Sequence, residues 1–530
     1  MDMEELEKLD FVIKTVGSLP LLRDFVVQMD FARIIDQHCP LAPQAELSCG
    51  AVAELLVVNR LQAPKPLYKV EHWARQAGVA EVFGIPPELL NDDRLGRVAE
   101  MLGPQAPVLK GEISLHLAKA FHLGLEQIHW DLTTIYLEGA YEEDPDNAAL
   151  PGEGMQVKYA REGQERAKKA IKVGLNVAND GHGPIPIYYE PLDGNASGYQ
   201  VTLANIVHLK EQLKLDRIIR INDRGCQSAK ILVHSLAHGF DTIAPLTFTK
   251  GIAKLVREAL AVGATLRPLA YVPFNQQQKD PSKRDGYSAF ELPYELQYKK
   301  RVYPVRLIVV KSEGKVKRAQ KLRQRHMRWI EERLQQLQGR VGKPRWTKKR
   351  LNNGIRKVLK QYPEGQLYNV SLIGFGKHAR ELRVEVDLAK LQEATLWEGM
   401  YALVTTLSAD TYTTDQVFQR YKEQHYVERS NHILKGHLLV NPVYLKKPIR
   451  IEGLLFLLWL ALVVYLLIER KYRNYTTKPK HKRRTTLDIL EAFEGYGWVL
   501  IKVSTGYYRR ASTLTEDQQE IYTVLGLSPP

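Results

Sequence analysis

An uncharged apolar run from Gly453 to Ile468 limits what this sequence can fold into. Its sixteen residues (GLLFLLWLALVVYLLI) lie between Arg450 and the charged triplet Glu469-Arg-Lys. A helix needs roughly 20 consecutive apolar residues to span a bilayer, so the run is short for a membrane span. We therefore expect a helix buried in the core of a folded domain, with a membrane span as the alternative.

The segment just before this run is polar. Tyr421 to Lys435 contains neither Pro nor Gly over fifteen residues, which predicts one continuous helix. At about 100° per residue, Tyr421, Gln424, Glu428 and Lys435 lie within roughly 60° of one another. Such a face is usually solvated surface. Because an apolar helix follows it, we expect Glu428 to be a metal-binding acid that completes a set begun upstream.

The bulk composition indicates a basic, folded protein of several domains. The 530 residues predict three or four domains, and the net charge of +15 suits a polyanionic partner, either nucleic acid or an anionic membrane surface. A basic bias without function is the alternative. Three cysteines make no disulfide or zinc pattern, and the acidic start is unlike a signal peptide. We expect a cytoplasmic protein associated with the nucleoid.

Residues 1–120 are expected to form a helical N-terminal domain. Apolar residues recur at helical spacing in Leu19–Cys39 and Gly50–Leu61. The segment Trp73–Ile85 is similar to a helix-turn-helix, which would make this domain a DNA end-binding domain. A helical packing domain explains the same pattern equally well.

Residues 121–244 have the pattern of alternating strands and helices. Ile128, Trp130 and Leu132 alternate with polar residues, which places Asp131 on the polar face of a strand. A hairpin is expected over residues 171–189. Residues 218–223 read as a short buried strand that ends at Asp223, just before a helix. Open α/β sheets place their chemistry at such strand ends, although an Asp there is as often a turn or capping residue.

Residues 245–405 are expected to form an inserted domain of hairpins around a strongly basic helical region. Lys317, Lys321, Arg325 and Arg328 share one helix face. Further cations follow in residues 343–360, namely Lys343, Arg345, Lys348, Lys349, Arg350, Arg356, Lys357 and Lys360. A solvated helix face is the alternative, but few acids offset this charge, so we expect these residues to contact DNA phosphates. A second basic run at 470–484 precedes a small C-terminal α+β unit within residues 471–530.

Asp131, Asp223 and Glu428 are hard oxygen ligands of the kind that Mg²⁺ prefers. Their contexts resemble the DDE transposases of bacterial insertion sequences that carry a Tyr-x2-Arg-x3-Glu-x6-Lys signature. The signature stands here as Tyr421, Gln424, Glu428 and Lys435. Trp130-Asp131, Asn222-Asp223, the segment Glu398–Thr406, Leu438–Tyr444 and the apolar run also look like the family.

The resemblance implies an RNase H-like catalytic core within an α/β fold. Asp131 would lie on the first strand, Asp223 after the fourth and Glu428 on a later helix. The core would comprise residues 121–244 and 406–470, interrupted by a largely β insertion at 245–405. These acids would be catalytic and would bind two Mg²⁺ ions, for which Mn²⁺ substitutes.

One position departs from the family pattern, because Gln424 stands where the family has Arg. Gln donates hydrogen bonds but carries no charge. Arg420 lies one turn earlier and could supply that charge. We expect Arg420, Tyr421, Gln424 and Lys435 to contact the DNA backbone.

The resemblance implies a DNA transposase that cleaves the ends of its insertion element and joins them to target DNA. Its partners would be double-stranded terminal inverted repeats and target DNA. A dimer on DNA is expected because two ends must be held together, and no membrane is expected. The alternatives are a nuclease of the same core that does not join strands, and a decayed or repurposed DNA-binding protein without catalysis.

Overall fold

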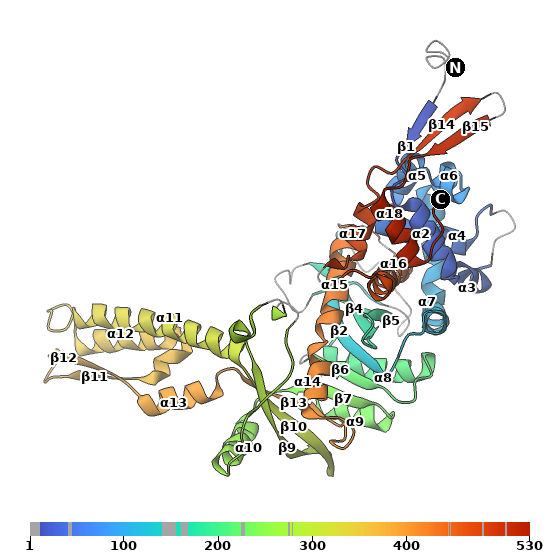
Figure 1. The fold of residues 1–530 in the computed structure, drawn as a ribbon. Helices are drawn as coiled ribbons and strands as arrows, with labels where there is room; N and C mark the ends of the chain where they lie inside the picture. The colour runs from blue at the N-terminus through green and yellow to red at the C-terminus, as the bar shows by residue number, and fades with distance from the viewer. Residues whose placement is uncertain are drawn as a thin grey trace. The chain divides into compact units, whose positions relative to one another are not determined.

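The computed structural model describes residues 11–40, 45–139, 155–160, 168–223, 228–273, 276–277, 279–441, 443, 445, 447–479, 482–503 and 506–530. The chain forms two compact units (Figure 1). The first unit comprises residues 1–243 and 420–530, and the second comprises residues 244–419. The second unit therefore corresponds closely to the insertion expected from the sequence.

A mixed β-sheet lies at the centre of the first unit. Strand β2 (Gln127–Tyr136) pairs antiparallel with β4 (Lys169–Ala178) and parallel with β6 (Ile219–Asn222). The remaining strands are β5 (Ile185–Asp193) and β3 (Lys158–Tyr159), both antiparallel to β4, and β7 (Asp241–Leu246), parallel to β6. The predicted strands and the hairpin over residues 171–189 are confirmed, and the fold class is mixed α/β.

The two faces of β2 meet different surroundings because successive side chains point to opposite sides. Trp130 is fully buried, and its indole Nε1 donates a hydrogen bond of 3.0 Å to Thr202 Oγ1 in helix α8 (Gly198–Gln212). Helix α9 (Ala229–Ala237) follows β6 and is capped by Ser228. The other face carries Gln127, His129 and Asp131.

The apolar run is the middle of helix α16 (Pro448–Tyr475), and it packs as a core helix. In length and apolar composition α16 would be able to cross a membrane, yet 89% of its most apolar window is buried inside the protein. It crosses helix α7 (Asp92–Ala120) at Gly453, where a Cβ would lie 2.0 Å from the Ala99 carbonyl oxygen. Only glycine permits this close approach, which brings two long helices into contact.

The N-terminal and C-terminal segments share one hydrophobic core with the sheet, and that core runs from Val16 to Leu527. Strand β1 (Phe11–Lys14) pairs with β14 (Trp498–Val503), which pairs with β15 (Gly506–Ala511). The expected separate domains 1–120 and 471–530 are therefore parts of one unit. These two segments contain the helices α2 (Leu19–Gln28), α3 (Phe31–His38), α4 (Cys49–Gln62), α5 (Val70–Ala77), α6 (Val79–Phe83), α17 (Thr486–Glu491) and α18 (Glu516–Leu525).

The helix-turn-helix expected at residues 73–85 corresponds to α5 and α6. They are joined at Gly78, which adopts a left-handed conformation. Helix α6 has only five residues, and Val79 and Val82 are buried. This geometry is that of a short packing hairpin, with no long exposed second helix to enter a DNA groove.

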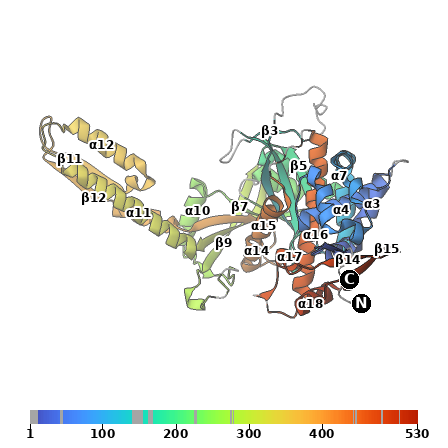
Figure 2. The ribbon, with the colours of Figure 1, turned by 90° about the horizontal axis from the view of Figure 1, so that it is seen from above.

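The second unit combines a sheet with a helical and β-hairpin extension (Figures 1 and 2). Its sheet consists of β8 (Arg267–Pro268), β9 (Tyr287–Tyr298), β10 (Arg301–Ser312) and β13 (Met400–Thr405), accompanied by α10 (Lys250–Ala261). The extension consists of α11 (Glu313–Gln338), α12 (Lys348–Gln361), the hairpin β11 (Tyr368–Ile373) and β12 (Glu381–Val386), and α13 (Leu388–Trp397). Helices hold more residues than strands here, so the expectation of a largely β insertion is wrong.

Candidate active site

Asp131 and Asp223 lie next to each other on neighbouring parallel strands. The register of β2 and β6 pairs Trp130 with Asn222. The residue that follows Trp130 is Asp131, and the residue that follows Asn222 is Asp223. Side chains at matching positions of parallel strands point to the same face of the sheet. The structure therefore brings the two aspartates to neighbouring positions, with Asp131 in the middle of β2 and Asp223 directly after β6. Arg224 to Gln227, which follow Asp223, lie outside the described residues.

The predicted single helix over 421–435 is broken into three pieces. Helix α14 (Thr414–Lys422) ends before Glu423, α15 (His425–Ile433) follows, and a π-helical turn covers Leu434–Leu438. At the break, the N–H groups of Glu423 and Gln424 bond the carbonyls three residues earlier, each over 3.2 Å. This tighter 3₁₀ winding changes the angular positions along the helix, so the four signature residues do not share one regular face.

Contacts with β2 explain the break, since Glu423 and Gln424 both turn their side chains toward that strand. The Glu423 carboxylate accepts hydrogen bonds from Gln127 Nε2 (2.6 Å) and Asn179 Nδ2 (2.9 Å). Gln424 Nε2 donates to the Trp130 carbonyl over 3.3 Å. Its Oε1 lies 3.2 Å from His129 Nδ1. Gln424 is only 9% exposed, so its predicted phosphate contact finds no support in this geometry.

His129 is a neutral link in this buried network. Gln127 Nε2 lies 2.8 Å from His129 Nε2, which must accept that hydrogen bond, so Nδ1 carries the proton donated to Gln424. Burial lowers the pKa of His129 to about 4. Arg420 Nη1 donates to Gln127 Oε1, which places the predicted DNA-contacting arginine at the edge of the same network.

Glu428 and Asn431 approach Asp131 from helix α15. Asn431 Nδ2 donates a 2.9 Å hydrogen bond to Asp131 Oδ2. The pKa of Asp131 is raised to about 6, chiefly by burial and also by the negative charges of Asp223 and Glu428, while hydrogen bonds from the Leu132 backbone and from Asn431 act to lower it. Strongly perturbed carboxyl groups with like-charged neighbours are frequent at functional sites. The three predicted acids therefore belong to one electrostatic cluster.

The ligand types of this cluster suit a divalent cation. Their present spacing does not, because within the described ranges no three His, Cys, Asp or Glu side chains lie close enough together to hold one. Three carboxylates supply hard oxygen ligands. Asn431 Oδ1 is buried and lacks a hydrogen-bond partner among the described residues, so it is a further oxygen that a cation would satisfy. Neither Asn431 nor His129 was predicted from the sequence. Asn431 could have been found from its position one helical turn after Glu428.

Helix α15 is anchored on its other side by a buried ion pair. Glu469 of α16 is 3% exposed. Its carboxylate lies 2.6 Å from Arg429 Nη2 on α15 and 2.7 Å from Arg473 Nη1. Helix α15 is thus held between the sheet and the apolar helix α16.

The other predicted DNA-contacting residues are divided between the two units. Lys435 is exposed in the π-helical turn and lines a small cavity of roughly 220 Å³ together with Thr134 and Tyr136 of β2. Tyr421 is half-buried on α14. The remaining predicted residues belong to the second unit: Lys321, Arg325, Lys349 and Arg350 are exposed, and Lys348 is half-buried.

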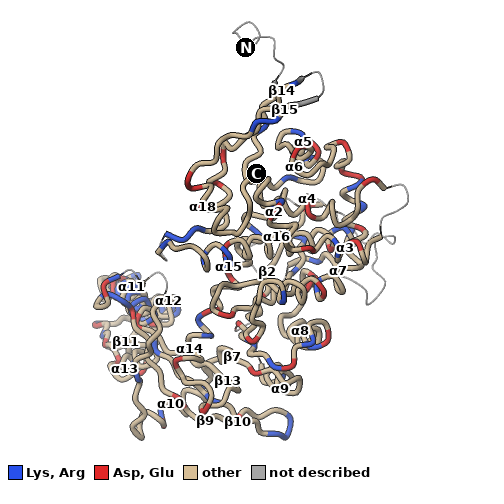
Figure 3. The backbone as a smooth tube through the Cα atoms, turned by 45° about the vertical axis from the view of Figure 1, so that its right-hand side comes forward, with Lys and Arg blue, Asp and Glu red and all other residues tan. Residues whose placement is uncertain are grey.

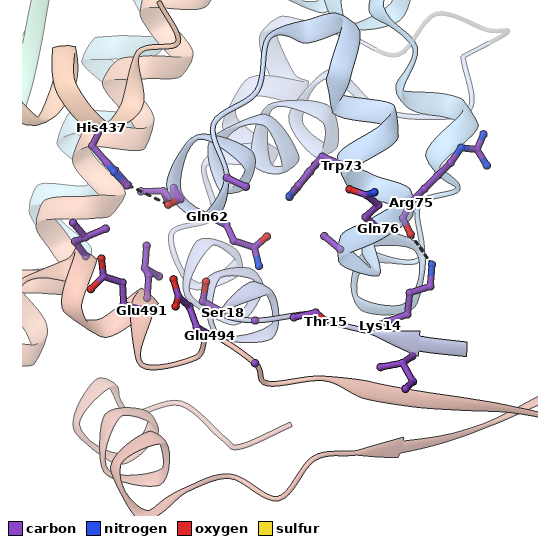
Figure 4. A pocket seen from close by; sticks show the side chains of 18 of the residues that line it. Lys14, Thr15, Ser18, Gln62, Trp73, Arg75, Gln76, His437, Glu491 and Glu494 are labelled. Atoms are coloured by element: carbon purple, nitrogen blue, oxygen red, sulfur yellow. Dashed lines mark hydrogen bonds between the residues drawn. The ribbon is translucent and has the colours of Figure 1, made fainter. Parts of the chain in front are cut away.

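A larger cavity of roughly 700 Å³ lies beside β1, α4 and α5 (Figure 4). None of the three acids lines it. Two of its polar side chains are bonded to backbone carbonyls, namely Lys14 Nζ to Arg75 (2.6 Å) and His437 Nε2 to Leu61 (3.2 Å). Its charged lining residues are Lys14, Arg75, Glu491 and Glu494, so it is separate from the acidic site.

Comparison with known proteins identifies only part of the chain. Residues 11–105 match a family described as a domain of unknown function, DUF4277, and no curated protein matches. Among solved structures, the chain is similar to a piggyBac transposase in a synaptic complex with hairpin DNA. The match has a TM-score of 0.36 and 8% sequence identity over 89% of this chain and 79% of that chain. Similarity this low does not establish a shared fold or activity.

Proposed function

We propose that the chain is a Mg²⁺-dependent DNA transposase with an RNase H-like core. The observation that carries this proposal is the position of Asp131 in the middle of β2 beside Asp223, which directly follows the parallel strand β6, with Glu428 coupled to Asp131 by charge. Apart from the two-residue strand β3, the strands of this sheet follow one another along the chain as β2, β4, β5, β6 and β7. Asp131 thus lies on the first of them and Asp223 follows the fourth, which supports the proposal of such a core.

Each side chain has a defined role in this proposal. Asp131, Asp223 and Glu428 would hold two Mg²⁺ ions, which when bound supply the charge stabilisation required for in-line phosphoryl transfer. Asn431 orients the Asp131 carboxylate through its hydrogen bond. Lys435 is exposed beside β2, where it can contact a phosphate and fix the register of the DNA.

The substrate would be the two ends of the element that carries the gene, followed by target DNA. The net charge of +15 and the exposed cations of the second unit support a DNA partner. Joining requires two ends in one complex, so a dimer on DNA belongs to the proposal.

An assay of DNA cleavage and strand joining tests the proposed transposase activity. The substrate would be labelled duplexes taken from the DNA that flanks the gene, with Mg²⁺ or Mn²⁺ present. Asp131→Asn, Asp223→Asn and Glu428→Gln should each lower strand cleavage by at least about 100-fold, whereas Glu211→Gln, an exposed acid of the same unit, should retain it. Near-normal cleavage by any of the three variants would refute the assignment. Cleavage without joined product would indicate a nuclease of the same core that does not join strands.

A non-catalytic DNA-binding protein is the second candidate. It is favoured by one observation, that within the described residues the acids form no closed group of metal ligands. Duplex binding by the wild type without any metal-dependent cleavage would support this candidate.

A further inference from the structure

Two loops of the second unit meet at the end of the α11–α12 and β11–β12 extension, and we call them the hairpin tip (residues 339–350 and 374–380; Figures 1 and 2). The Lys348 N–H donates to the Lys377 carbonyl over 2.9 Å. Its Nζ donates to the Gly374 carbonyl over 2.6 Å. These bonds join the loops into one surface.

The hairpin tip is strongly positive. Its 19 residues contain no Asp or Glu and eight cations, namely Arg340, Lys343, Arg345, Lys348, Lys349, Arg350, Lys377 and Arg380. Figure 3 shows basic residues gathered along α11 and α12 in the same unit. A surface of this kind attracts a polyanion, because neutralising phosphates releases counterions.

Trp346 organises part of this charge. The guanidinium carbons of Arg340 and Arg350 lie 4.5 and 4.6 Å from its ring centroid. The indole is itself half-buried against the core of the extension. Stacking on this half-buried ring restrains both arginines in advance, so less side-chain entropy is lost when they bind a phosphate.

Phe375 lies in the loop between β11 and β12 and is 91% exposed, the most exposed large apolar side chain in the part of the chain that the structure describes. Gly374 (φ +143°) and Gly376 (φ +70°) flank it. A Cβ at 374 would lie 2.8 Å from the Arg380 nitrogen, so the loop depends on glycine there. Leaving a Phe in water forgoes the favourable free energy of apolar burial, which a partner could recover.

We propose that the hairpin tip binds duplex DNA and that Phe375 inserts between base pairs and bends the duplex. Apolar wedges flanked by cations act in this way in proteins that kink DNA. The cations contact the phosphates on either side of the wedge. The inference depends on the proposed function only for the choice of DNA as the polyanion.

The test measures affinity and bending with the full-length protein and a duplex of about 20 base pairs and arbitrary sequence, whose ends lie roughly 70 Å apart and are labelled for energy transfer. Phe375→Ala should reduce the change in energy transfer by at least half and weaken binding about 10-fold. Val262→Ala removes another exposed apolar side chain of the same unit (87% exposed) and should change neither quantity.

Charge removal gives an independent result. The variant K343A/R345A/K377A should make the negative slope of log affinity against log salt shallower by about 2.7, at about 0.9 for each phosphate contact that is lost. The control K250A/K254A/K300A removes three exposed lysines outside the tip and should leave the slope unchanged.

Equal bending by wild type and Phe375→Ala would overturn the proposal that Phe375 inserts between base pairs. A preference for single-stranded over duplex DNA that depends on Phe375 would overturn it as well. Loss of self-association in Phe375→Ala with unchanged DNA binding would also overturn it, because it would assign the side chain to a protein contact. Asp131→Asn separates the two proposals, since it should bind and bend DNA normally while failing to cleave it.

Discussion

Asn431 donates a hydrogen bond of 2.9 Å to Asp131, and this contact joins helix α15 to strand β2 across 300 residues of sequence. Asn431 follows Glu428 by three residues, so the same turn of helix carries an acid and the amide that orients another acid. The position of Glu428 at the site therefore depends on how α15 is seated on β2.

Removal of Asn431 should alter the pH dependence of cleavage. Its hydrogen bond favours the ionised form of Asp131 and lowers the pKa of that carboxyl. In Asn431→Ala the pKa rises, so the acid limb of the pH–rate profile should move to higher pH and the rate at pH 7 should fall about 10-fold. His432→Ala, exposed on the same helix, should leave the profile in place. An unchanged profile in Asn431→Ala would contradict the orienting role.

Asp131 should destabilise the metal-free protein at neutral pH. Its folded-state pKa of about 6 lies above the ordinary value of 3.8, so the native state binds the proton more tightly than the unfolded state. Stability is then lost as pH rises through about 6. In EDTA, Asp131→Asn should be more stable than wild type by about 2–3 kcal/mol at pH 8, with a smaller difference at pH 4.5. Denaturant unfolding at both pH values measures the difference in unfolding free energy between Asp131→Asn and wild type. The same difference at pH 8 and pH 4.5 would contradict the raised pKa of Asp131.

Local patterns in the sequence predicted the strands and the buried apolar helix, because alternation and apolar runs report local burial. The break in the helix at Glu423 and Gln424 was not predictable in this way. No Pro or Gly marks it, and its cause is a set of contacts with Gln127, His129 and Trp130 nearly 300 residues away. The pairing of β1 with β14 is likewise a long-range contact that local patterns do not reveal.

Replacing Gln424 with the arginine of the signature that this segment resembles should destabilise the fold. Gln424 is buried between His129 and the Trp130 carbonyl, and an arginine there would place a charge beside a neutral histidine. Gln424→Arg should lower the free energy of unfolding by about 2–4 kcal/mol, because a buried cation lacks a partner. Arg should be tolerated at the neighbouring exposed His425. Thermal unfolding compares the two variants, and a stable, more active Gln424→Arg protein would refute this packing role.

Loss of the Glu469 carboxylate should release helix α15 from α16. Glu469→Ala leaves Arg429 and Arg473 without their shared partner, which should cost about 3–5 kcal/mol of stability. Glu100→Ala is the matched control, since Glu100 pairs with Lys447 and Arg450 near the surface and should cost about 1 kcal/mol or less. Equal costs in the two variants, measured by denaturant unfolding, would contradict the anchoring role of Glu469.

The most direct test of the central claim is Mn²⁺ binding by the purified full-length protein, followed by electron paramagnetic resonance of the free ion. The claim is that Asp131, Asp223 and Glu428 form one metal site, so each of Asp131→Asn, Asp223→Asn and Glu428→Gln should weaken Mn²⁺ binding by at least about 10-fold, while Glu211→Gln should not. Binding of equal strength in wild type and all three variants would contradict it.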